Sequence, residues 1–258
     1  ADKLRQKFYA STATALCGMN GRYIEMDYQE TQMYGDVMAM VKKQLNDFTL
    51  DVAIGGSIND RITNSTRIDS KNASLKYANV FNLANIVMSS SASIDQKIDA
   101  HYQLQSVFAT AQIGYKEGVF LDLTARNDWS STLAYTKYEK KGFFYPSAGV
   151  SFLPNKWVKM PEWVSFSKLR GAYSIVGNGV PPFITYPVSY VTAGGEILAS
   201  DAAPFAEMKP EMTHSVELGM EWKFLQHRLG LNLNNYRTDT AEQFFKLPAL
   251  AGDKYAYR

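Results

Sequence analysis

A strict two-residue alternation of apolar and polar side chains is the feature that most constrains how this chain can fold. Between residues 215 and 224, one set of alternate positions is apolar: Val216, Leu218, Met220, Trp222 and Phe224. The positions between them are mostly polar or charged: Ser215, Glu217, Gly219, Glu221 and Lys223. Because successive side chains of a β-strand point to opposite sides, this segment has one apolar and one polar face. A turn at 226–228 follows, and leucines at 229, 231 and 233 repeat the pattern, which predicts a hairpin.

The same hairpin unit recurs along the chain. The predicted strand pairs are 37–45 with 48–55, 106–115 with 119–126, 144–152 with 168–175, and 215–224 with 229–234. The third pair is the weakest, and Phe108 and Phe120 break the alternation in the second. We therefore predict about eight antiparallel strands in up-and-down order, with each strand paired to its neighbour in the sequence.

The connections between these strands differ in length in a regular way. Turns 45–47, 116–118 and 226–228 are short, whereas segments 59–100 and 177–213 are long. Short turns on one side and long loops on the other are typical of outer-membrane β-barrels. The long segments should then lie on the outer side and the short turns on the periplasmic side. A closed soluble sandwich, with the apolar face against a second sheet, is the alternative fold.

Hydropathy and aromatic residues narrow the membrane question. No stretch approaches the roughly 18 consecutive apolar residues of a membrane-spanning helix, so a helical membrane protein is excluded. Aromatic rings lie at the predicted strand ends, where a barrel places its interfacial girdles. They are Tyr115, Trp129, Phe144, Trp157, Trp163, Trp222 and Phe224.

Charge and side-chain chemistry argue against an enzyme or a nucleic-acid partner. The net charge is +2, with no basic block, so no nucleic acid is expected. Glu217 and Glu221 lie about 13 Å apart along one strand, too far for a glycosidase pair, and are interpreted as lumen-facing charges. Cys17 is the one cysteine, and the histidines lack the spacing of metal ligands: His101, His214 and His227. We expect no catalytic residues, no metal and no cofactor.

Several strings carry a resemblance to a known family. The two clearest are 105–115 and 120–133, the second of which contains Arg126, Asn127, Asp128, Trp129 and Ser130. Others follow in the same order at 55–60, 144–147, 163–173, 209–211, 235–240 and 243–245. Over roughly residues 35–250, the chain resembles the barrel region of the SusC/RagA family of TonB-linked outer-membrane proteins.

This resemblance implies an architecture and a function. Residues 1–258 would form part of one barrel domain of about 22 strands, whose lumen is plugged. The plug domain and the TonB box would lie outside this chain, both ends look cut, and the start is not a signal peptide. The whole protein would import oligosaccharides or peptides across the bacterial outer membrane. Its partners would be TonB, membrane lipid and a SusD-like surface lipoprotein. A barrel that only binds, such as an adhesin, is the alternative.

Two groups of residues are candidate functional sites. Arg126, Asn127, Asp128 and Trp129 lie where a strand leaves the membrane; they either contact a ligand or hold register, with Trp129 as an interfacial anchor. The loop 177–208 carries Phe183, Tyr186 and Tyr190. These rings could stack on sugars or pack against a protein lid, because aromatic platforms lose little conformational entropy on binding. Alternatively, the loop folds on itself over the barrel mouth.

Overall fold

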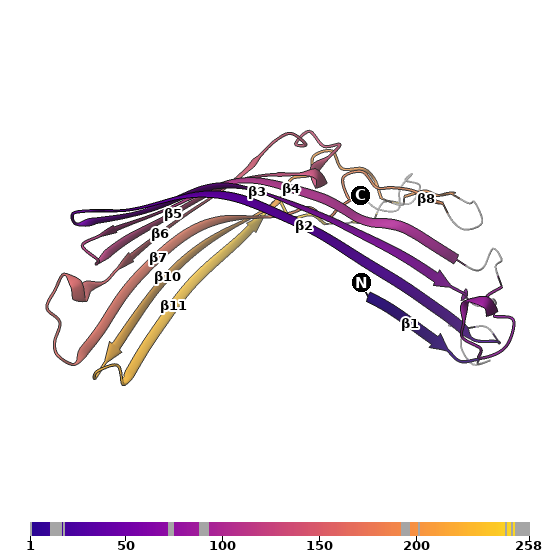
Figure 1. Ribbon diagram of the computed structural model, residues 1–258, viewed down its shortest axis with the longest axis horizontal. Helices are drawn as coiled ribbons and strands as arrows, with labels where there is room; N and C mark the ends of the chain where they lie inside the picture. Colours follow the sequence, from indigo (N-terminus) through magenta and orange to yellow (C-terminus); the bar gives the residue numbers. More distant parts are fainter. Residues whose placement is uncertain are drawn as a thin grey trace.

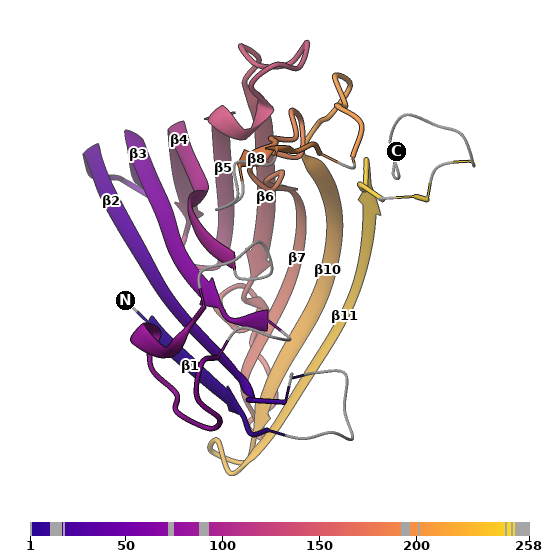
Figure 2. The same cartoon turned by 90° about the vertical axis from the view of Figure 1, so that its right-hand side faces the viewer.

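The computed structural model describes residues 2–10, 17, 19–71, 75–87, 93–191, 197–200, 202–245, 247–248 and 250. Nine antiparallel strands form one sheet in the order β1-β2-β3-β4-β5-β6-β7-β10-β11. The strands are β1 (Asp2–Phe8), β2 (Arg22–Leu45), β3 (Phe48–Asp69), β4 (Ser93–Tyr115), β5 (Val119–Ser130), β6 (Phe143–Phe152), β7 (Val164–Asn178), β10 (Glu211–Phe224) and β11 (Leu229–Ala241). The sheet is an open arc whose edges are β1 and β11 (Figures 1 and 2). The predicted all-β, up-and-down arrangement is confirmed.

The remaining elements are small and lie in the connections. β8 (Tyr190–Val191) and β9 (Ile197–Leu198) form a separate two-stranded hairpin between β7 and β10. Three single 3-10 turns are η2 (Leu83–Asn85), η3 (Ser131–Leu133) and η4 (Pro154–Lys156). Among the described residues, no helix is long and apolar enough to cross a membrane.

Strand register gives the sheet one apolar and one polar face, because directly paired residues of neighbouring strands project on the same side. One row of paired residues runs Val41, Val52, Ala111, Leu123, Ala148, Tyr173 and Val216. The adjacent row runs Lys42, Asp51, Gln112, Asp122, Gly149, Ala172 and Glu217. We call the two sides the apolar face and the polar face.

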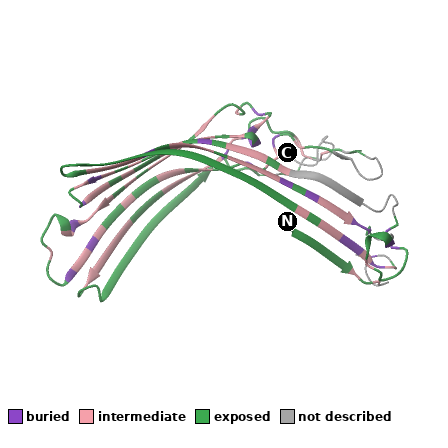
Figure 3. Cartoon of the chain, in the orientation of Figure 1, coloured by how far each residue is buried: buried purple, intermediate pink, exposed green. Residues whose placement is uncertain are grey.

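The apolar face is exposed rather than packed against another sheet. Met220 pairs with Leu233 and Trp222 with Leu231, which places the apolar residues of β10 and β11 together as predicted. Leu218 is 61% exposed, and the other sheet in the described part of the chain is the short β8–β9 hairpin. Figure 3 shows that buried positions are few and scattered along the strands. The soluble sandwich is therefore wrong for this chain, since that fold requires the apolar face to be covered.

Three strands are much longer than the sequence predicted. β2, β3 and β4 have 24, 22 and 23 residues, whereas the strands from β5 to β11 in the main sheet have 10 to 15. A membrane-spanning strand needs about 9–11 residues, so β2–β4 continue for roughly 30 Å beyond the band (Figure 1). The predicted bounds of the long loop, 59–100, were wrong. Because β3 ends at Asp69 and β4 begins at Ser93, the connection between them is residues 70–92.

The projecting part escaped sequence analysis because both of its faces carry polar side chains. Lys3 Nζ lies 3.7 Å from Glu25 Oε1, and Arg5 Nε lies 3.5 Å from Glu25 Oε2, in a ladder of ion pairs between β1 and β2. Thr63 and Ser65 occupy the opposite face. A strand whose two faces both carry polar side chains has no apolar–polar alternation to reveal it.

Candidate functional site

Two loops at the end of the sheet opposite the short turns fold together into one unit, which we call the loop cap. It consists of the β5–β6 connection (131–142) and the described residues of the β7–β10 connection (179–191, 197–200 and 202–210). Its small core contains Leu133, Val180 and Met208, with Phe143 and Ile184 packed against them. Backbone bonds join the loops as well: the amide of Lys137 donates to the carbonyl oxygen of Ala206 at 3.2 Å. The cap therefore has a fixed shape with its own buried interior.

The aromatic candidates from the sequence lie on this cap. Tyr186 is 55% exposed and its ring contacts that of Tyr135 in a tilted arrangement, with ring centroids 4.9 Å apart and planes inclined by 38°. Phe183 is 37% exposed and has a φ of 63°, a left-handed conformation that is uncommon for a bulky residue. Tyr190 pairs with Leu198 through the backbone, and its side chain lies outside the described residues.

Sequence analysis missed Tyr135, whose ring contacts that of Tyr186. Its ring is 72% exposed and its φ is 64°. Beside this pair, Thr185, next to Tyr186, donates its hydroxyl to the carbonyl oxygen of Thr132, three residues before Tyr135, at 3.4 Å. The two residues of this hydrogen bond are 53 positions apart in the sequence, so no local sequence pattern predicts it.

Lysine side chains surround a second tyrosine of the cap. The Nζ atoms of Lys137, Lys141 and Lys209 lie 5.5, 5.7 and 5.6 Å from the centre of the Tyr138 ring, within the range of cation–π attraction. Lys209 also pairs with Glu242 at 3.0 Å, and this hydrogen bond raises the pKa of Lys209. The ammonium groups of the cap are thus partly matched by carboxylates.

The motif at the end of β5 divides between the two faces. The guanidinium of Arg126 donates to Asp128 Oδ1 at 2.7 Å and to Ser106 Oγ at 2.7 Å. Asn127 and Trp129 project on the opposite side, and a Cβ at Gly142 would lie 2.9 Å from Trp129 Cε2. The Trp129 ring therefore lies against the backbone at Gly142, the last residue of the β5–β6 connection.

Aromatic rings mark two levels on the apolar face. At the short-turn end, Tyr115 lies 4.7 Å from Phe48 and 5.5 Å from Trp157 between ring centroids, and Trp163 stacks on Phe224 at 5.6 Å. Trp129 lies at the other end of β5, ten residues beyond Val119, which pairs with Tyr115. At the usual rise and tilt, ten residues cover about 25 Å along the barrel axis, the height of a lipid-facing band.

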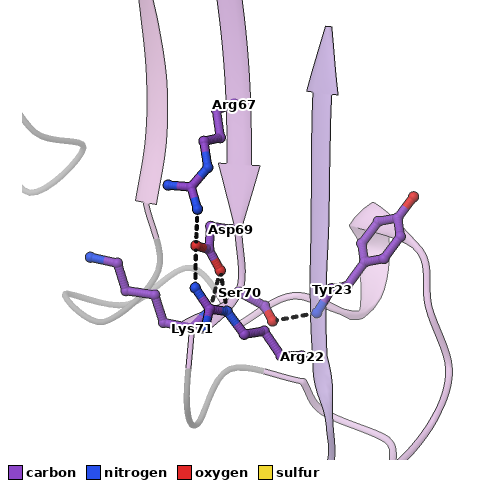
Figure 4. A network of polar contacts seen from close by, with 6 residues as sticks. All are labelled: Arg22, Tyr23, Arg67, Asp69, Ser70 and Lys71. Atoms are coloured by element: carbon purple, nitrogen blue, oxygen red, sulfur yellow. Dashed lines mark hydrogen bonds and ion pairs between the residues drawn. The ribbon is translucent and has the colours of Figure 1, made fainter. Parts of the chain in front are cut away.

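A buried carboxylate anchors the tip of the projecting strands (Figure 4). Asp69, with a side chain only 2% exposed, accepts two bonds from Arg22 at 2.8 and 2.7 Å and one from Arg67 at 2.6 Å. The amide of Lys71 donates to the same carboxylate at 2.9 Å. Burial opposes ionisation, but these hydrogen bonds and the two guanidinium charges outweigh it and hold the pKa of Asp69 below its ordinary value. The network fixes the start of the loop that follows β3.

That loop folds back onto the tip of the sheet. Leu75 and Ile86 form a buried cluster with Tyr23 of β2, and Ile68 and Phe81 pack against it. Inside the loop, the Asn85 side chain donates to the carbonyl oxygens of Tyr77 and Val80 at 2.8 and 2.7 Å. The segment 75–87 is therefore a compact lobe at the far end of β2 and β3.

The described residues contain no group of three or more His, Cys, Asp or Glu side chains that could hold a metal ion. Two of the three glutamates of β10, those singled out in the sequence, are engaged in ion pairs. Glu217 lies 3.2 Å from Arg170, and Glu221 lies 3.2 Å from Lys223.

Comparison with known proteins places the chain in a family. Residues 3–256 match the family model described as TonB dependent receptor-like, beta-barrel. The chain belongs to this family, so it is part of an outer-membrane β-barrel, from a family of receptors and transporters. The predicted relationship to TonB-linked barrels is confirmed. No curated protein matches the chain in sequence.

Solved structures of a transporter called RagAB share the fold. The structure of the RagAB peptide transporter matches with a TM-score of 0.78 and 17% identity, over 99% of this chain and 29% of that chain. The RagAB peptide importer in the 'open-open' state matches with a TM-score of 0.75 and 18% identity, over 99% and 28%. The RagAB peptide importer in the 'closed-closed' state matches with a TM-score of 0.73 and 18% identity, over 92% of this chain and 27% of that chain. The chain thus spans less than a third of the length of these relatives.

Proposed function

We propose that the whole protein imports bulky nutrients, oligosaccharides or peptides, across the outer membrane with energy supplied through TonB. The observation that carries this proposal is the open nine-stranded arc with one apolar and one polar face, in a chain of the TonB-dependent receptor family. A polar inner wall of such width suits a lumen that admits large hydrophilic substrates. Peptides are the first class to test, because the solved structures of similar fold are titled a peptide transporter and importer.

The proposed partners are TonB, through a region outside this chain, and a SusD-like surface lipoprotein over the barrel mouth. Phe183, Tyr186 and Tyr190 of the loop cap are the proposed contacts for substrate or lipoprotein. The exposed rings of Phe183 and Tyr186 support this role, because apolar area held in place by a packed loop costs little entropy to bind with.

The motif of β5 has a structural role in this proposal. Arg126 and Asp128 fix the strand by polar contacts on the lumen side, as their bond to each other and the bond to Ser106 suggest. Trp129 anchors the strand at the outer interface, where amphipathic rings are favoured, and Asn127 lies beside it on the same face. None of these four residues is proposed to act in catalysis.

Uptake by a strain lacking the gene, complemented with the full-length protein, tests the proposal. Cells are offered panels of labelled peptides and oligosaccharides, with and without TonB. We expect complementation to restore uptake of at least one class, and only when TonB is present. Surface binding of a ligand without uptake would instead establish the alternative, a barrel that only binds.

The aromatic contacts are tested separately with a triple variant, Phe183→Ala, Tyr186→Ala and Tyr190→Ala. We expect reduced uptake or reduced lipoprotein binding, with a normal amount of barrel in the outer membrane. Tyr77→Ala is the matched control, since Tyr77 is 71% exposed but lies on the separate 75–87 lobe. Unchanged uptake and unchanged binding in the triple variant would remove the site and leave the transport proposal standing.

A further inference from the structure

A shallow hollow of about 370 Å³ interrupts the apolar face. It is lined by the small side chains Ala109, Ala111, Ala125 and Ala148 on β4, β5 and β6, by Leu123 of β5, which pairs with both Ala111 and Ala148, and by Val52 of β3 and Tyr173 of β7. A volume above roughly 300 Å³ is in the range of ligand sites. The hollow is thus a cavity open toward the lipid, bounded on both sides by larger side chains.

The hollow lies midway between the two aromatic levels. Ala111 and Ala109 are four and six residues from Tyr115 at the short-turn end of β4, and Ala125 is four residues from Trp129 at the outer end of β5. This depth corresponds to the hydrocarbon interior of the bilayer. Water does not fill an apolar hollow at this depth, because the water molecules would lose hydrogen bonds that the apolar lining cannot replace.

A polar cluster lies above the hollow on the same face. The Tyr173 hydroxyl and His214 Nδ1 are 2.9 Å apart. His214 pairs across strands with Asp239, which accepts a hydrogen bond from Arg237 Nε at 2.9 Å. His214 is ten residues from Phe224 at the turn, so this cluster sits at the outer interface, about 25 Å above the periplasmic girdle.

Tyr173 connects the two features, since its ring lines the hollow and its hydroxyl belongs to the polar cluster. An apolar groove that ends in hydrogen-bonding groups at the membrane surface matches an amphiphile. We propose that this part of the wall binds one acyl lipid of the outer membrane, with a chain in the hollow and the polar head beside Tyr173 and His214. The occupant is a lipid because the hollow is continuous with the lipid-facing surface of the barrel. This inference does not depend on what the protein transports.

Photo-crosslinking of the full-length protein tests the proposal. The protein is placed in phosphatidylethanolamine vesicles doped with phosphatidylethanolamine that carries a diazirine on an acyl chain, and the cross-linked peptides are mapped by mass spectrometry. We expect stronger labelling of peptides from β4 to β6 than of the equally lipid-exposed β10–β11 hairpin.

Filling the hollow should abolish this preference. The double variant Ala111→Leu and Ala148→Leu displaces at least two chain methylenes, which lowers labelling of β4–β6 roughly tenfold. Ala39→Leu is the control. It is also an alanine-to-leucine change, and Ala39 lies on the apolar face of β2 but does not line the hollow. Tyr173→Phe keeps the ring and removes the hydroxyl, and should weaken labelling by a smaller factor.

Three results would overturn the proposal. The first is equal labelling of all strands, which describes bulk lipid. The second is labelling of β4–β6 that the double variant leaves unchanged. The third is cross-linking between two barrels at β4–β6, which assigns the hollow to a second copy. The unheated mobility of each variant on a gel shows whether the barrel has folded, so a loss of labelling is not mistaken for unfolding.

Discussion

At the scale of single residues, glycines on β3 and β4 accommodate the two phenylalanines that interrupt the alternation. Phe108 pairs with Gly55, and a Cβ built on Gly55 would lie 2.7 Å from Phe108 Cζ and 2.6 Å from the Val37 carbonyl oxygen. Phe120 pairs with Gly114, whose added Cβ would lie 3.1 Å from the Phe120 ring. Each ring lies over bare backbone on the polar face, a known means of fixing strand register.

This arrangement predicts that Gly55→Ala destabilises the barrel by about 1–3 kcal/mol, because neither the ring nor the carbonyl can retreat without strain. Gly35→Ala on β2 is the control, since the nearest atom to its added Cβ is Ile58 Cγ2 at 3.9 Å. Urea unfolding of the full-length barrel in detergent measures both variants. Equal midpoints for the two would mean that Phe108 is not held against Gly55.

The carboxylate of Asp69 gives a pH-dependent prediction for the tip of the projecting strands. Because the folded protein lowers the pKa of Asp69, its contribution to stability is complete above the unfolded value of about 3.9 and is lost as pH falls through the lower folded value. Asp69→Asn should remove about 1–3 kcal/mol of local stability at pH 7, because Arg22 and Arg67 lose a charged acceptor. Hydrogen exchange of residues 68–87 at pH 7 measures this loss.

Relative to an unfolded chain at the same pH, the amides of the wild-type lobe should be strongly protected from exchange at pH 7 and should lose this protection only in strong acid. The amides of the Asn variant should be weakly protected at both pH values. Protection in the variant that equals the wild type at pH 7 would show that packing of Tyr23, Leu75 and Ile86 alone holds the lobe.

At the scale of elements, the asymmetry between turns and loops predicts which end of the sheet is outside. The turn after β4 carries Glu117, and the loop cap carries Lys140, and both side chains are exposed. In intact cells and a Cys17→Ser background, Lys140→Cys should react with an impermeant thiol reagent and Glu117→Cys should react only after lysis. The reverse pattern would invert the topology together with every site placed on it.

The surroundings of each strand decide how well the sequence predicts it. β10 was predicted within four residues and the start of β11 was predicted correctly, because lipid on one side and polar surroundings on the other impose the alternation; the end of β11, at Ala241, lies seven residues beyond the prediction. The outer halves of β2 and β3 were missed, because ion pairs such as Arg5 with Glu25 replace the apolar face there. The segment 177–208 was predicted to be a loop with aromatic rings. The contact between Tyr135 and Tyr186 was not predicted, because it depends on contacts between distant segments.

At the scale of the whole molecule, the sheet is a sector of a wall. Its edge strands β1 and β11 are exposed, and open edges are not tolerated inside a bilayer. The full-length protein must therefore close the barrel with further strands. The rim of this sector is uneven: β2–β4 project beyond the shorter strands, at whose ends the loop cap lies (Figure 1).

The central claim is that the apolar face contacts lipid and the polar face lines the lumen. A nitroxide scan along β10 of the full-length protein in lipid vesicles, in a Cys17→Ser background, tests it most directly. Labels at Val216, Leu218 and Met220 should collide mainly with oxygen, which concentrates in the bilayer. Labels at Ser215, Glu217 and Glu221 should show much less oxygen contact and greater access to a water-soluble nickel chelate. The account predicts this two-residue alternation across β10; uniform accessibility, or the same alternation with the faces exchanged, would contradict it.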